Sequence, residues 1–119
     1  DLDGFKRYND LHGHRKGDEL LRDAANLVLS SVRSGVDTCY RYGGDEFVIM
    51  MPETGGENAR VVAERIRGQL AARFEGVVTA SIGIAESALY LDVERLLERA
   101  DRAMYQAKSM GGNRTLLVE

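Results

Sequence analysis

The sequence has 119 residues, of which 44% are apolar and 29% charged, and its formal net charge is −3. These values are typical of one soluble globular domain and exclude a long disordered chain. The acidic balance argues against a protein that coats nucleic acid, because such a protein needs a basic face. It leaves a nucleotide substrate open, since a metal and a few local cations can hold phosphates.

Cys39 is the single cysteine, so we expect neither an intramolecular disulfide nor a zinc cluster. No apolar run reaches the roughly 18 residues of a membrane helix, and no signal peptide is recognisable. We therefore expect a cytoplasmic domain. A membrane anchor upstream of Asp1 stays an open alternative.

The hydrophobic pattern predicts nine elements in the order β-α-α-β-β-α-β-α-β. This order indicates an α+β fold, a ferredoxin-like or palm-type antiparallel sheet with helices packed on it. Because the chain opens at the end of a strand, we expect it to be N-terminally truncated, as part of one domain over 1–119. The expected elements are a strand end at 1–3, helices at 5–11 and 17–33, a hairpin of strands 36–42 and 47–51, a helix after 54–57, a strand at 77–85, a helix from 92 to 110 and a strand at 115–118.

Two helix starts carry local signals. Residues 54–57 read TGGE, the form of a capping box, and Asp92 is of the type that caps a helix. Both are predicted to accept backbone N–H groups.

Acidic side chains occur at two places that a palm-type sheet brings together. Asp1 and Asp3 alternate on one side of a strand end, and Asp45 and Glu46 follow a Gly-Gly hairpin turn. Carboxylates that converge repel one another unless a cation neutralises them. Oxygen ligands with room for phosphate favour Mg²⁺, with Mn²⁺ as an alternative. Solvated strand and hairpin ends are the plain alternative.

A second group of polar residues follows the first strand. A helix start at Phe5 and Lys6 offers free N–H groups to an anion, and Asn9 lies on the same face. Asp18 opens the predicted long helix, where it either caps that helix or accepts guanine N–H groups. Lys108, at the end of the last helix, either reaches a phosphate or satisfies the final carbonyl groups.

Taken together, these segments resemble the GGDEF domains that act as diguanylate cyclases. The matching text is DLDGFKRYND, GHRKGDELL, RYGGDEF, TASIGIA and ADRAMYQAK followed by GGNR, in this order along the chain. A lone GGDEF pentapeptide is a weak signal, but five ordered segments are specific.

The resemblance implies a role for each matching position. Asp1, the carbonyl of Leu2, Asp45 and Glu46 correspond to the metal site, with Asp45 also as the general base. The positions that correspond to substrate contacts are Phe5 and Lys6 for the triphosphate, Asn9 and Asp18 for guanine, Gly43 and Gly44 for close approach of the backbone, and Lys108 for a phosphate.

Three departures from the family pattern stand out. Gly112 replaces an expected basic residue, so one phosphate contact is lost or Arg114 substitutes for it. In the product-inhibition motif, Asp37 matches the expected aspartate. Ser34 occupies the position of the expected arginine, and Arg33 lies one residue before that position. A helix and most of the first strand, which precede Asp1 in the family, are expected upstream.

The resemblance therefore implies an enzyme that condenses two GTP into cyclic di-GMP and pyrophosphate in bacterial second-messenger signalling. Its partners would be GTP, a second GGDEF domain in a homodimer, and a fused sensory or receiver domain, but no nucleic acid. The main alternative is an inactive GGDEF-like module that senses GTP. A palm-type transferase acting on nucleic acid is less favoured, because it needs a basic channel.

Overall fold

The computed structural model describes residues 1–87 and 92–118. Its element order agrees with the order predicted from the sequence. The elements are β1 (Leu2–Asp3), α1 (Phe5–His12), α2 (His14–Ser31), β2 (Thr38–Gly43), β3 (Glu46–Met50), α3 (Gly56–Arg73), β4 (Thr79–Ala85), α4 (Val93–Ser109) and β5 (Arg114–Val118).

The strands form a three-stranded sheet in the order β1-β4-β5 and a separate two-stranded hairpin, β2-β3. β1 pairs antiparallel with β4, whereas β4 and β5 run parallel, so the sheet is mixed rather than antiparallel throughout. The parallel pair follows from chain connectivity, because α4 carries the chain back across the sheet between the two strands. One backbone hydrogen bond, from Leu2 N to Asp45 O (3.2 Å), links β1 to the hairpin.

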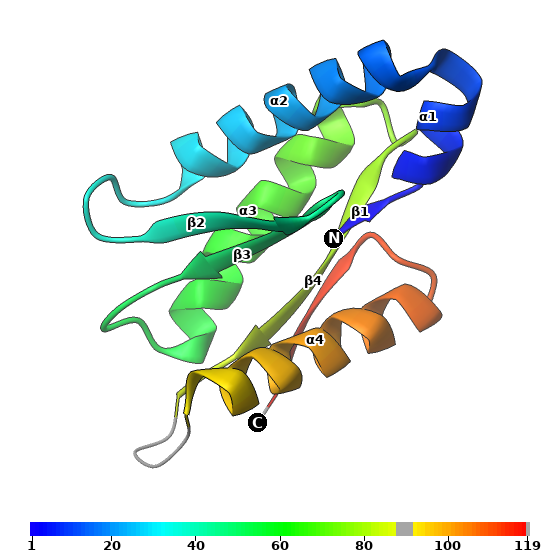
Figure 1. The fold of residues 1–119 in the computed structure, drawn as a ribbon. Helices are drawn as coiled ribbons and strands as arrows, with labels where there is room; N and C mark the ends of the chain where they lie inside the picture. The colour runs from blue at the N-terminus through cyan, green and yellow to red at the C-terminus, as the bar shows by residue number, and fades with distance from the viewer. Residues whose placement is uncertain (88–91, 119) are drawn as a thin grey trace.

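Helices cover both faces of the sheet (Figure 1). Alternation along β5 shows the two faces: the Thr115 hydroxyl donates to Glu64 of α3, whereas the preceding Arg114 points toward the α4 side. α4 lies against β4 at Gly83, where a side chain would collide with the α4 backbone. Only glycine permits this close approach of helix and strand.

The core lies between the sheet and the pair α2 and α3. Apolar residues at helical spacing on α2 and α3 face alternate residues of β1 and β4, as the sequence pattern predicts. The buried cluster consists of Leu2, Leu20, Leu21, Ala24, Val28, Ile66, Leu70, Val78 and Ala80.

The two capping predictions have different outcomes. Asp92 accepts the backbone N–H of Arg95 (2.9 Å), which confirms it as the cap of α4. The prediction of a capping box at 54–57 is wrong, because α3 begins after Gly55 and has no side-chain cap. Thr54 instead donates to the carbonyl of Pro52 and accepts from Arg33 (2.8 Å), so a tertiary contact takes the hydroxyl.

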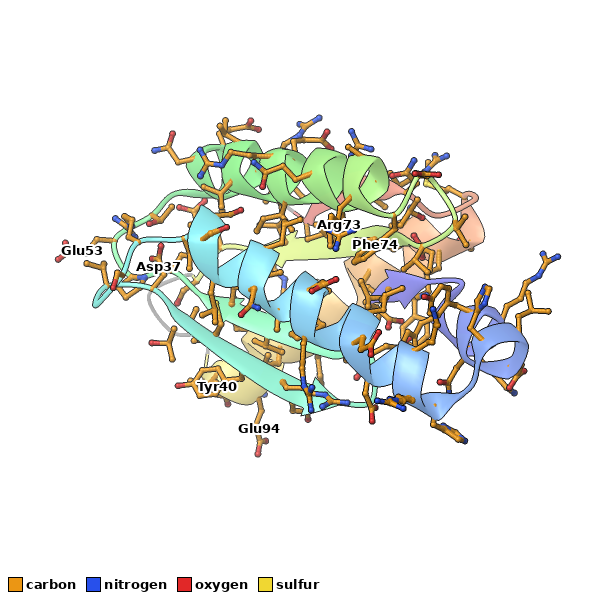
Figure 2. The ribbon with its side chains drawn as sticks, turned by 90° about the horizontal axis from the view of Figure 1, so that it is seen from above. Asp37, Tyr40, Glu53, Arg73, Phe74 and Glu94 are labelled. Atoms are coloured by element: carbon orange, nitrogen blue, oxygen red, sulfur yellow. The ribbon has the colours of Figure 1, made fainter. Side chains whose placement is uncertain are left out.

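Arg33 contacts both loops at the end of the hairpin opposite its turn. Its guanidinium pairs with Asp37 (2.7 Å) and donates to Pro52 O and Thr54 Oγ1. Figure 2 shows Asp37 and Glu53 at the same end of the molecule, in the loops before β2 and after β3. This contact joins the end of α2 to the segment that leads into α3.

In the described part of the chain, no helix has both the length and the apolar character needed to cross a membrane.

Candidate active site

Asp1 and Asp3 lie on one side of the β1 end, as strand alternation predicts. Lys108 at the end of α4 reaches both carboxylates, with its Nζ 3.1 Å from Asp1 Oδ2 and 3.2 Å from Asp3 Oδ1. Lys108 therefore contacts two acids rather than the last carbonyl groups of its helix. One ammonium facing two carboxylates leaves this corner with a net negative charge.

The second carboxylate oxygen of Asp1 has no partner. Asp1 Oδ1 is buried and accepts no hydrogen bond, while the Asp1 side chain is 13% exposed. A buried anionic oxygen without a donor is costly, so it marks a place where a cation belongs. The backbone of Asp1 is fixed by an exchange of two hydrogen bonds with Ser81, each 3.0 Å long.

Asp3 differs from Asp1 because donors saturate its carboxylate. Burial alone would raise the pKa of Asp3, but hydrogen bonds from the Asn113 N–H, Ser81, Thr79 and Lys108 outweigh it and lower the pKa. The distances are 2.9 Å from Asn113 N, 2.7 Å from Ser81 Oγ and 2.9 Å from Thr79 Oγ1. Asp3 is thus ionised, and its ion pair with Lys108 positions that ammonium beside Asp1.

The hairpin turn brings two further carboxylates toward this corner. Gly43 pairs with Glu46, so Gly44 and Asp45 form the turn, and the positive φ of Gly44 (34°) suits glycine. The turn lies beside β1, because the Leu2 N–H donates to the Asp45 carbonyl (3.2 Å). The hairpin turn is therefore next to the strand end that carries Asp1.

The described acidic residues do not complete a metal site by themselves. Among residues 1–87 and 92–118, no three Asp, Glu, His or Cys side chains converge closely enough to hold a metal by themselves. The buried side-chain oxygen there that lacks a partner is Asp1 Oδ1. Ligand oxygens from phosphates would complete such a site.

The N-terminus of α1 lies directly after β1. Gly4 is its cap and offers no side-chain acceptor, so the first N–H groups, at Phe5 and Lys6, have no capping partner. Lys6 is exposed, whereas Phe5 packs against the core. This end of α1 therefore presents free donors and a cation beside the acidic corner.

The two predicted base-reading residues come from neighbouring helices. Asn9 Nδ2 lies 2.9 Å from His14 Nδ1, and its amide contacts Gly17, where any side chain would collide with it. Asp18 is exposed in the second turn of α2, since the helix begins at His14, and so it does not cap that helix.

A cavity of about 410 Å³ opens between α2 and the hairpin, and Asp18 is on its wall. Leu21 and Phe47 supply apolar lining, while Arg22 and Arg41 supply charge. Asn9 does not line this cavity.

The arrangement invites comparison with known proteins. A sequence model of the family "Diguanylate cyclase, GGDEF domain" matches residues 1–114, which is nearly the whole chain. The chain belongs to the GGDEF domain family.

Relatives and solved structures agree with this assignment. The chain is 40% identical to diguanylate cyclase A of Treponema denticola over 98% of its length, and 44% identical to the response regulator PleD of Caulobacter vibrioides over 95%. It spans only 33% and 27% of those two proteins.

The fold matches the GGDEF domain of DgcB from Caulobacter crescentus, solved with c-di-GMP. The TM-score is 0.91 with 31% identity, over 98% of this chain and 73% of that one. The active GGEEF domain of a diguanylate cyclase from Vibrio cholerae matches with a TM-score of 0.86 and 35% identity, over 100% of this chain and 79% of that one.

In this GGDEF domain Lys108 contacts Asp1 and Asp3, the Asp45 carbonyl accepts from the Leu2 N–H, and Asn9 and Asp18 lie on α1 and α2. Leu2 is buried in the core, with only its backbone available to the site. Sequence reasoning missed the donors to Asp3, namely Thr79, Ser81 and Asn113. The alternation of polar residues in TASIGIA was a signal for the first two, once β4 is known to pair with β1.

Proposed function

We propose that this domain is a diguanylate cyclase that condenses two GTP into cyclic di-GMP and two pyrophosphates. The observation that carries the proposal is the partnerless oxygen of Asp1, buried on β1 beside the hairpin turn and shortly before the uncapped N-terminus of α1. The names of the relatives support the same activity.

The residues at the corner fit a divalent metal. Asp1, the Leu2 carbonyl, Asp45 and Glu46 would hold Mg²⁺ or Mn²⁺, and Asp1 Oδ1 is the oxygen that lacks any other partner. When bound, the ion would neutralise charge on the triphosphate and on the acids around it.

The nucleotide would lie along β1, α1 and the hairpin. N–H groups at Phe5 and Lys6 and the ammonium of Lys108 would bind phosphates. Asp18 would accept the N–H groups of guanine, and Asn9 would add an amide contact. Gly43 and Gly44 leave room for the nucleotide, because a side chain at either would meet no atom within 4 Å.

Each condensation exchanges one phosphorus–oxygen bond for another. The 3′-hydroxyl oxygen of one GTP attacks the α-phosphorus of the other, and the bond from that phosphorus to the β-phosphate oxygen breaks, which releases pyrophosphate. Asp45 takes the proton of the attacking hydroxyl. A second, identical condensation closes the ring, and most of the rate comes from positioning and preorganised charge.

Because one domain holds only one GTP in this scheme, two domains must face each other. We infer that the partner is a second copy in a homodimer. A fused sensory or receiver domain would regulate their approach, and the relative named as a response regulator supports this.

One observation favours the inactive, GTP-sensing alternative. Lys108 already bridges Asp1 and Asp3, so part of the acidic charge is neutralised without a metal. In that case GTP would bind to the domain without turnover.

The test is incubation of purified protein with GTP and Mg²⁺, followed by mass spectrometry for cyclic di-GMP and calorimetry for GTP binding. The proposal predicts product that requires the divalent ion. Saturable GTP binding without product would favour the sensor, and absence of both would refute the two proposals.

A further inference from the structure

Asn113, in the turn between α4 and β5, joins the acidic corner to a helix on the other face of the sheet. Its backbone N–H donates to Asp3 Oδ2 (2.9 Å), and its side-chain Oδ1 accepts from Arg67 Nη1 (2.9 Å). Asp3 contacts Lys108 of α4, whereas Arg67 lies on α3, and these two helices cover opposite faces of the sheet (Figure 1). One exposed residue therefore connects elements on both faces.

The backbone of Asn113 adopts a conformation that needs support. Its φ is 50°, in the left-handed region, and it follows two glycines that also have positive φ. Asparagine tolerates this region better than most residues, but the conformation persists only where the surroundings fix it. The bond from Arg67 to the side chain and the bond from the N–H to Asp3 fix it from two sides.

Arg67 is itself held in place on α3. Its Nε donates to Glu64 Oε2 (3.1 Å), and the other oxygen of Glu64 accepts from the Thr115 hydroxyl (2.7 Å). The Arg67 side chain is 25% exposed, so most of it is covered by the protein. Because the nitrogens of a guanidinium share one rigid plane, the pair with Glu64 also directs Nη1 toward Asn113.

The same turn ends α4, the helix that carries Lys108. The Gly112 N–H donates to the Ala107 carbonyl and the Gly111 N–H donates to the Lys108 carbonyl, each over 3.0 Å. This pair of bonds is the Schellman arrangement found at the ends of many helices. The backbone of Lys108 is thus bonded directly to the turn that Asn113 completes, while its ammonium reaches both carboxylates of the acidic corner.

We propose that Arg67 is a positioning residue of the nucleotide site and acts through Asn113. By fixing Asn113, it keeps the α4–β5 turn in place, and that turn holds Asp3 and Lys108. Lys108 is the ammonium that would bind phosphate, so a displaced turn weakens phosphate binding and leaves the contacts to the base intact. This inference rests on the proposed function.

A double-mutant cycle tests the pathway through Asn113. Arg67→Ala, Asn113→Gly and the double variant are titrated by calorimetry with a non-hydrolysable GTP analogue and Mg²⁺. Glycine at position 113 keeps the N–H and suits the positive φ, so the change removes only the amide side chain. Each single variant should bind the analogue roughly fivefold more weakly, on the scale of one hydrogen bond. The double variant should be no weaker than either single variant, because both changes break the same bond.

Two further measurements separate positioning from a general loss of structure. Guanosine has no phosphate, so its affinity for Arg67→Ala should stay within about twofold of the parent value. Hydrogen exchange at the Asn113 N–H, measured by NMR without nucleotide, should be roughly fivefold faster in Arg67→Ala, because the N–H is then less firmly held on Asp3. Arg67→Lys should recover part of the analogue affinity, since an ammonium can still donate to the Asn113 amide.

Arg60→Ala is the matched control. Arg60 lies about two turns earlier on α3 and also pairs with a glutamate three residues before it, Glu57 (3.9 Å). Its removal should leave both affinities and the exchange rate unchanged. Unchanged analogue binding by Arg67→Ala, additive losses in the double variant, or an equal loss for guanosine would overturn the inference. If the parent binds no analogue, the proposed function fails and the positioning role fails with it, which the parent titration alone reveals.

Discussion

Asp45 lies in a two-residue hairpin turn, where its side chain has no packing role in the core. We expect Asp45→Ala to reduce turnover by about a hundredfold or more, because the proposed mechanism uses Asp45 as a general base and as a metal ligand. The far-ultraviolet circular dichroism spectrum and the melting temperature should stay close to those of the parent. Unchanged product formation in this variant would remove Asp45 from the proposed role.

Gly112 combines a positive φ of 72° with direct contact to the Asp3 carboxylate. Gly112→Ala should lower the free energy of unfolding by ~1–2 kcal/mol, because the alanine is strained and its methyl group meets Asp3. Urea denaturation measures the change.

Gly68→Ala on α3 is the matched control. A side chain there meets no atom within 4 Å, so alanine should raise the free energy of unfolding by ~0.4–1 kcal/mol. Destabilisation of similar size in both variants would show that the account of Gly112 is wrong.

At the scale of elements, the Thr115 hydroxyl joins β5 to α3 through Glu64 (2.7 Å). This hydrogen bond lowers the pKa of Glu64, burial opposes it, and Arg67 lowers the pKa further. The folded state therefore keeps Glu64 ionised to lower pH than the unfolded chain does. The resulting stability is fully present above the ordinary glutamate pKa of about 4.3 and is lost as pH falls through the lowered value.

Glu64→Gln should consequently make the free energy of unfolding depend less steeply on pH between neutral pH and acid. Urea denaturation across this range measures the slope. Glu19→Gln, at an exposed carboxylate of α2, should leave the slope unchanged. Identical slopes for Glu64→Gln and the parent would contradict the prediction.

The loop between α2 and β2 bears on regulation. Hydrogen bonds from Arg33 lower the pKa of Asp37 and cover its carboxylate, so this acid is already paired within the chain. With Ser34 at the expected arginine position, we predict weak feedback inhibition by cyclic di-GMP through this loop. Inhibition curves for parent and Asp37→Ala should coincide. Tight product binding that Asp37→Ala abolishes would contradict this.

Local sequence patterns predicted what depends on neighbouring residues. The helical spacing of apolar residues predicted α2 and α3, and the Gly-Gly pair predicted the hairpin. The aspartate at position 92 predicted the cap of α4. The capping box at 54–57 failed because Arg33, distant in sequence, takes the Thr54 hydroxyl. The donors that saturate Asp3 were likewise hidden, because they come from β4 and the α4–β5 turn and meet Asp3 only in the folded sheet.

At the scale of the whole molecule, the site is assembled from both ends of the chain. Asp1 on β1 meets Lys108 at the end of α4, while the hairpin joins them through the bond from Leu2 N to Asp45 O. Figure 1 shows the β1 end, the hairpin tip and the C-terminal end of α4 on the same side of the fold. At this edge the hairpin tip is exposed at Gly43 and Gly44.

The most direct test of the central claim, that two such domains together condense two GTP, is the initial rate of cyclic di-GMP formation across a wide range of protein concentrations. Sedimentation under the same conditions gives the fraction of dimer. The account predicts that the rate per molecule rises with the dimer fraction and reaches a plateau when dimers predominate. A constant rate per molecule down to concentrations at which only monomers sediment would contradict it.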